Sequence, residues 1–151
     1  MLRVTARLFV ALSLVLAVQM LSSPSNANMK RFAWQYRPLL VFAPALDDPK
    51  LARQHALLSG ARGGLRERDM VLIVVAGESV RAAGGPAPRM SAAALRARYG
   101  VSPDRFEVLL IGKDTGVKRR SSTPLPFASL ASQIDRMPMR RQEMRRQRAT
   151  Q

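Results

Sequence analysis

The chain has 151 residues, and its 25 lysine and arginine residues against 10 aspartate and glutamate residues give a formal net charge of +15. Hydrophobic residues make up 47% of it, which supplies enough apolar surface for a core and predicts one modest folded domain rather than a disordered basic protein. The absence of cysteine excludes disulfides, thiolate nucleophiles, iron–sulfur clusters and cysteine-ligated zinc, and a single histidine excludes clusters of imidazole ligands.

The first 27 residues predict export. Arg3 and Arg7 precede an apolar run, Leu8–Met20, and Pro24 and Ala27 follow it. A basic start, an apolar run of this length and small residues after it are typical of a signal peptide, cleaved here after Ala27. An uncleaved anchor is the less favoured alternative, because a spanning helix needs about 20 apolar residues. We expect a periplasmic or secreted protein whose remaining residues carry 23 basic against 10 acidic side chains, or +13.

An N-terminal extension, residues 28–36, precedes the predicted domain. Phe32, Trp34 and Tyr36 alternate in it with other residues. Alternating aromatic residues are compatible with an edge strand or with a flap that covers the core.

The first half of the domain predicts a strand followed by a helix. The continuous apolar run Pro38–Ala43 predicts a strand covered on both faces. Asp47 or Asp48 can cap a helix with Pro49 in its first turn, and the glycines of residues 60–64 are expected to end it.

A second buried strand is predicted over Met70–Ala76, where no polar residue interrupts the apolar run. Residues 77–89 are rich in glycine and proline and predict an exposed loop. Ser91 can cap a short helix that ends at Gly100.

Two further strands, Phe106–Ile111 and Val117–Ser121, are joined by a turn over Gly112–Gly116. The first two strands of the chain must be parallel if a helix crosses between them. The expected fold is therefore α/β, with a central four-stranded mixed sheet and helices on both faces, which is the thioredoxin-like arrangement.

The last predicted apolar helix runs from Pro126 to Met137, with apolar residues at intervals of three and four. Pro138 is expected to break or kink it, which places the thioredoxin-like domain at residues 37–138. Residues 139–151 form an arginine-rich helix or tail, with at most a short helical continuation.

Four sequence blocks, in this order along the chain, resemble the bacterial domain-of-unknown-function family 4174. They are Arg37–Pro44 with Asp48 and Pro49, Leu65–Val71, Val108–Asp114, and Ile134–Met139. The resemblance spans Arg37 to Arg146. It implies a fold similar to the thioredoxin-like domain of secreted animal sushi-repeat and coiled-coil-domain-containing matrix proteins, and it brings no established activity.

The loop after the first strand differs from that of redox-active thioredoxins, which carry Cys-x-x-Cys there so that the helix N-terminus can lower a thiol pKa. Here the loop reads Ala43–Pro49 and holds no sulfur. Thiol–disulfide oxidoreductase activity is therefore predicted to be absent, and no cofactor is expected.

Asp47 and Asp48 form a candidate site in this loop. An acidic pair can bind a cation or share a proton as general acid and base, but aspartate before a helix is the ordinary N-cap, which we favour. His55 has helical spacing to Leu51 and Leu58, so we expect a packing or surface histidine rather than a ligand or base. No catalytic or metal-binding residue is predicted.

Basic clusters form the second candidate site, for polyanions. Its members are Lys118, Arg119, Arg120, Arg140, Arg141, Arg145, Arg146 and Arg148. Guanidinium groups bind anions in a bidentate manner, and export favours an anionic envelope component or an acidic protein over nucleic acid as the partner. A solvated tail is the open alternative. We expect a non-catalytic binding or structural module of the cell envelope, the alternative being a metal- or carboxylate-dependent enzyme that uses the loop after the first strand.

Overall fold

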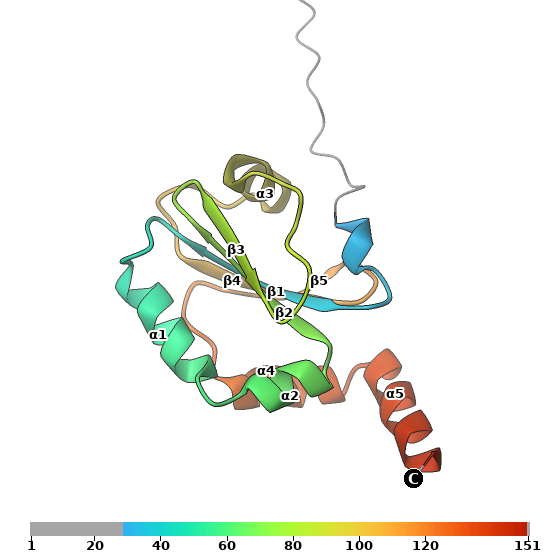
Figure 1. Cartoon of the computed structure of the whole chain (residues 1–151). Helices are drawn as coiled ribbons and strands as arrows, with labels where there is room; N and C mark the ends of the chain where they lie inside the picture. The colour runs from blue at the N-terminus through green and yellow to red at the C-terminus, as the bar shows by residue number, and fades with distance from the viewer. Residues whose placement is uncertain (1–28, 151) are drawn as a thin grey trace, which may run out of the picture.

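A five-stranded mixed sheet forms the centre of the molecule in the computed structural model, which describes residues 29–150 (Figure 1). The strands are β1 (Arg37–Ala43), β2 (Met70–Ala76), β3 (Ser79–Ala83), β4 (Glu107–Ile111) and β5 (Val117–Ser121). Their order is β3-β2-β1-β4-β5; β1 and β2 are parallel, and the other neighbouring pairs are antiparallel. The predicted signal peptide, residues 1–27, lies outside the described residues.

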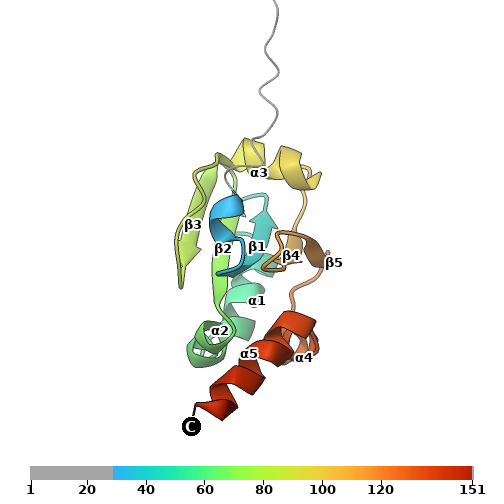
Figure 2. The same ribbon diagram turned by 90° about the vertical axis from the view of Figure 1, so that its right-hand side faces the viewer.

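Helices cover both faces of the sheet. They are the 3₁₀ helix η2 (Lys30–Phe32), α1 (Pro49–Leu58), α2 (Arg62–Glu67), α3 (Ala92–Tyr99), α4 (Phe127–Asp135) and α5 (Pro138–Ala149). The first face carries α1, α2 and α4, whereas α3 and η2 lie on the second. Helix α5 follows α4 and projects from the end of the molecule (Figure 2).

The central strand β1 contributes side chains to the cores on both faces of the sheet. Leu39 and Val41 point into the core under α1 and α4, whereas Leu40 and Phe42 point into the core under α3. Alternate side chains of a strand point to opposite faces of the sheet, and helices cover both faces here. Every residue of β1 is therefore buried, as the continuous apolar run predicts.

The prediction of a four-stranded sheet is wrong, because β3 occupies part of the predicted loop 77–89. The two residues Gly77 and Glu78 join β2 to β3, and Gly77 has φ +53°, a conformation suited to a tight hairpin turn. Val80 and Ala82 pack on the second core, whereas Arg81 points the other way. Apolar and polar residues do alternate along β3, but the strand is short and its alanines give only a weak hydrophobic pattern.

Helix α2 also departs from expectation, since Gly63 and Gly64 lie inside it rather than ending a helix. A Cβ on Gly64 would collide with the ring of Phe127. Close approach between α2 and α4, which brings Phe127 over the glycine, is therefore the physical reason for glycine at this position.

At the two ends of the described chain the structure decides between alternatives that the sequence left open, an edge strand or a flap at residues 28–36 and a helix or a tail at residues 139–151. The aromatic segment near residue 32 is not an edge strand; it turns through η2 and covers the second core with Met29 and Phe32, both buried. At the other end, Pro138 starts a new helix of twelve residues, since proline fits the first turn, where its missing N–H leaves no bond unmade.

Candidate functional site

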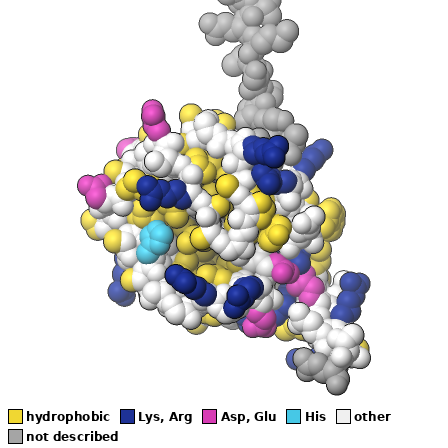
Figure 3. Space-filling view, viewed as in Figure 1, with side chains coloured by type: hydrophobic (Ala, Val, Ile, Leu, Met, Phe, Trp, Pro, Cys, Tyr) yellow, Lys and Arg dark blue, Asp and Glu magenta, His cyan; other side chains and the backbone are white. Residues whose placement is uncertain are grey.

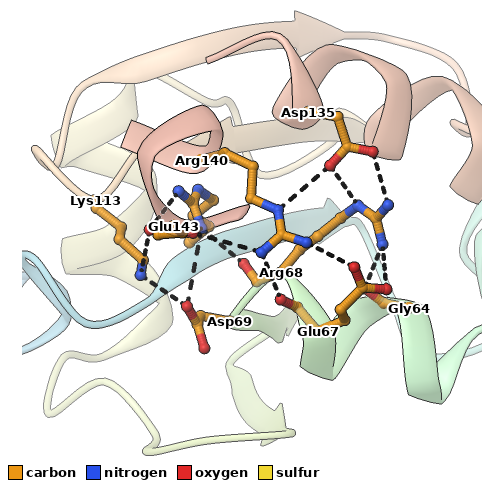
Figure 4. Close-up of polar contacts among 9 residues, drawn as sticks. Gly64, Glu67, Arg68, Asp69, Lys113, Asp135, Arg140 and Glu143 are labelled. Atoms are coloured by element: carbon orange, nitrogen blue, oxygen red, sulfur yellow. Dashed lines mark hydrogen bonds and ion pairs between the residues drawn. The ribbon is translucent and has the colours of Figure 1, made fainter. Parts of the chain in front are cut away.

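Eight charged side chains meet where α5 docks on the rest of the molecule (Figure 4). We call them the ionic network: Arg37, Arg68, Lys113 and Arg140 with Glu67, Asp69, Asp135 and Glu143. They come from the start of β1, from α2 and the turn after it, from the β4–β5 turn, and from α4 and α5. Four positive and four negative groups make the network neutral.

Glu143 of α5 is the centre of one half of the network. Both of its carboxylate oxygens accept from Arg37, at 3.2 and 3.0 Å, and Lys113 lies 2.8 Å away. Arg37 is only 1% exposed, and its Nη1 also donates to the carbonyl of Arg68. Burial acts to raise the pKa of Glu143, but the hydrogen bonds from Arg37 and Lys113 outweigh it and hold the pKa below its ordinary value.

Arg140 holds the other half together. Its side chain is 1% exposed and donates to a carboxylate oxygen of Glu67 at 2.6 Å, to the Glu67 carbonyl at 3.1 Å and to Asp135 at 3.4 Å. Arg68 binds both oxygens of Asp135, at 3.0 and 2.7 Å. Burial acts to raise the pKa of Asp135, but the contacts with Arg68 and Arg140 lower it overall.

The network corrects one predicted site residue. Arg140 cannot belong to an exposed anion-binding surface, because it is buried and its donors are used within the chain. Sequence reasoning missed the network, since its members are up to 106 residues apart. A signal was present, because each block of the family resemblance contains members: Arg37, Glu67 to Asp69, Lys113 and Asp135.

Helix α5 presents four of the predicted arginines to solvent: Arg141, Arg145, Arg146 and Arg148. None of these four has an ion pair or a side-chain hydrogen bond to the rest of residues 29–150. Arg141, Arg145 and Arg148 are spaced by four and three residues and therefore share one stripe of the helix, about 10 Å long. The network fixes the inner side of α5, so this stripe is held in a defined place.

The predicted basic residues of β5 are engaged differently. Lys118, Arg119 and Arg120 contact, in turn, Asp114 at 2.6 Å, the Ser129 hydroxyl at 2.6 Å and Glu107 at 2.8 Å. The hydrogen bond from Lys118 lowers the pKa of Asp114. Strand β5 lies at an edge of the sheet, where charged side chains discourage pairing with another chain. The structure thus separates the basic side chains of β5, which bind groups within the chain, from the four exposed arginines of α5, which do not.

Asp48 of the predicted loop site caps α1. Its carboxylate accepts from the backbone N–H groups of Lys50 at 2.8 Å and Leu51 at 3.1 Å, while Asp47 is exposed. The described residues, 29–150, contain no group of three or more histidine, cysteine or acidic side chains placed to hold a metal ion. The loop therefore offers a helix cap, and no observation favours acid–base or metal chemistry there.

Arg96 of α3 occupies the carboxyl ends of the two parallel strands, the place where open α/β sheets usually bind ligands. Its Nη2 donates to the carbonyl of Ala43 at 2.6 Å and lies 3.4 Å from that of Val75, and its guanidinium stacks 5.7 Å from the Phe42 ring centre. Burial lowers the pKa of Arg96. This end of β1 and β2 is closed by a side chain of the protein itself.

A pocket of about 290 Å³ lies between α1 and the β2–β3 hairpin. Leu51, Leu72 and Val74 give it an apolar wall, and the exposed His55 and Arg81 also line it. The histidine and the hydrophobic side chains around it are visible on this face in Figure 3. His55 is thus a surface histidine that lines a pocket.

Comparison with known proteins identifies a family. The family described as "Domain of unknown function (DUF4174)" matches residues 28–143. No solved structure matches the chain. Within residues 29–150, none of the helices combines the length and apolar character required to cross a membrane.

Proposed function

We propose that this chain, which belongs to the domain-of-unknown-function family DUF4174, is an exported, non-catalytic module that binds a polyanion in the cell envelope through α5. The observation that carries the proposal is the exposed stripe of arginines on a helix whose other side is fixed by the ionic network.

Charge accounting supports a polyanion as the ligand. Seven of the ten acidic side chains already bind a cation or cap a helix within the chain, so the excess of positive charge faces solvent. Arginine forks bind phosphate, sulfate and carboxylate groups in a bidentate manner, and binding releases condensed counterions. A rigid stripe loses less conformational entropy on binding than a frayed tail would.

Two further features support a binding role in the envelope. The N-terminal residues 1–27 have the basic, apolar and small-residue pattern of a signal peptide. The loop after β1, where thiol enzymes of similar topology carry their cysteines, has Asp48 as a helix cap, and Arg96 fills the adjacent strand ends.

We also propose that the fold is thioredoxin-like. Strand β1, helices α1 and α2, and strand β2 form a parallel unit, and β4, β5 and α4 form an antiparallel unit beside it. The order β2-β1-β4-β5 supports this assignment, with β3 added beyond β2.

Retention on immobilised heparin tests the polyanion proposal. The quadruple variant R141Q/R145Q/R146Q/R148Q removes the stripe and leaves the network intact. Its matched control, R53Q/R62Q/R66Q/R105Q, removes the same charge from four exposed arginines elsewhere that have no ion pair or side-chain hydrogen bond within residues 29–150. We expect the α5 variant to elute at lower salt than the control, and binding of the unmodified chain to weaken as salt rises.

Equal elution of the two variants would show that net charge alone determines retention, and it would contradict a role for α5. Truncation of residues 139–151 is a poorer test, because it also removes Arg140 and Glu143 from the network.

A further inference from the structure

Trp34 stands out on the surface beside the β4–β5 turn. It is 69% exposed and has φ +65°, a left-handed conformation that bulky residues rarely adopt. Such a backbone persists only where its surroundings enforce it. Here the Trp34 N–H donates to the carbonyl of Lys113 at 2.7 Å, and the buried Phe32 accepts from the backbone of Gln35 and Tyr36.

The turn therefore buries one aromatic side chain and directs the next into solvent. Phe32 is 1% exposed and contacts Tyr36 edge to face, with ring centres 6.4 Å apart. Burial of Trp34 would be the default for an indole, which carries a large apolar area. Its outward position at an unfavourable backbone conformation points to an external contact.

The surroundings of Trp34 combine apolar side chains with charged groups of both signs, since Lys113, Lys118 and Asp114 all line the adjoining pocket. Val117, 45% exposed, lies at the end of the β4–β5 turn whose Lys113 carbonyl binds Trp34. A pocket of about 320 Å³ continues from this turn to Met137 and Met139 at the start of α5. Trp34 and Val117 are two of the three large, exposed hydrophobic residues among residues 29–150. We call Trp34, Val117 and the adjoining pocket the Trp34 surface.

Basic groups flank the Trp34 surface at both ends. Lys30 and Arg31 are exposed on η2, and the arginine stripe of α5 lies beyond the pocket. Figure 2 shows η2, the β4–β5 turn and α5 on the one side of the molecule that faces the viewer. The chain enters the described structure at Met29, nine residues after Met20, where the apolar run ends.

We propose that the Trp34 surface docks on an anionic lipid bilayer, with the indole at headgroup depth and the α5 arginines on the lipid phosphates. Indole rings favour the membrane–water interface, and arginines near an anionic surface attract it. The proposal rests on the polyanion-binding role of α5 and adds the class of partner. An apolar indole between two basic groups fits a lipid surface better than a free acidic polymer, which offers no apolar phase.

Fluorescence tests the proposal directly, because Trp34 is the single tryptophan of the chain. With the full chain and vesicles of phosphatidylglycerol and phosphatidylcholine, we expect its emission to shift to shorter wavelength and to be quenched by lipids brominated near the headgroup. The double variant W34F/L46W moves the reporter to an exposed residue of the pocket beside α1, and its emission should stay unchanged.

Binding is measured by co-sedimentation with the same vesicles. Trp34→Gly removes the indole and suits the left-handed backbone, so the fold is retained while vesicle partitioning falls at least about tenfold. Leu46→Gly, the matched control, removes an exposed apolar side chain outside the Trp34 surface and should leave partitioning unchanged. Loss of the α5 arginines should cost about fivefold per side chain.

The outcomes separate this proposal from the polyanion proposal. Heparin retention without any change of Trp34 emission on anionic vesicles, or equal partitioning of Trp34→Gly and Leu46→Gly, overturns membrane docking and leaves polyanion binding in place. Binding that is equally strong to vesicles of pure phosphatidylcholine and to anionic vesicles also overturns membrane docking, because insertion of the apolar run Leu8–Met20 alone would give that result. If the unmodified chain binds neither heparin nor anionic vesicles, both proposals are overturned.

Discussion

Replacing Glu143 by glutamine tests whether the ionic network holds α5. The substitution keeps the size of the side chain and one acceptor oxygen but removes the charge that faces Arg37 and Lys113, which are 1% and 8% exposed. Breaking a buried ion pair costs about 3 to 5 kcal/mol. Because Glu143 is 22% exposed and glutamine can still accept, we expect a loss of about 2 to 3 kcal/mol in the free energy of unfolding.

The measurement is urea unfolding at pH 7, followed by circular dichroism. With a slope of about 1.5 kcal/mol per molar urea, the midpoint should fall by about 1.3 to 2 M. Glu78→Gln is the matched control, since it makes the same chemical change at an exposed residue without an ion pair in the described chain, and it should stay within about 0.5 kcal/mol. Equal midpoints for the two variants would refute the inference that the network anchors α5.

The same pair of proteins gives a pH test. The pKa of Glu143 is held below its ordinary value of 4.5, so its contribution to stability is present above that pH and is lost as the pH falls through the lower, folded-state pKa. The difference in stability between the unmodified chain and Glu143→Gln should therefore shrink on acidification below about pH 4.5. If the difference in stability between the two proteins stays the same at pH 2, the charge of Glu143 is not what stabilises the unmodified chain.

Three other outcomes are expected. Gly64→Ala should lose about 1 to 3 kcal/mol of stability because its Cβ collides with Phe127, whereas Gly63→Ala, with open space around it, should be neutral or gain up to about 1 kcal/mol; thermal unfolding distinguishes them. Asp48→Ala should lose about 0.5 to 2 kcal/mol with the α1 cap, and a similar loss in Asp47→Ala would argue against capping as the cause. The pure protein should not reduce insulin disulfides, since it has no cysteine, and turnover in that assay would refute the prediction.

Local sequence patterns located most of the elements around the core. The apolar runs of β1 and β2 have no polar interruption, so burial on both faces could be inferred without a structure. The cap of α1 was equally accessible, because aspartate followed by proline is a local signal. Strand β3 was missed because it has only five residues, most of them small or polar. These residues form a strand because they pair with the edge of β2, which the local sequence does not show.

The candidate site depended more strongly on tertiary structure. Composition and the charge pattern alone established that the chain is basic, has no sulfur chemistry and carries an arginine-rich C-terminus. Which arginines are free was decided by folding: Arg140 and Arg141 are adjacent in sequence, yet one is buried among carboxylates from α2 and α4 and the other faces solvent. Ion pairs form between groups that distant segments bring together, so a linear sequence shows their charges but not their partners.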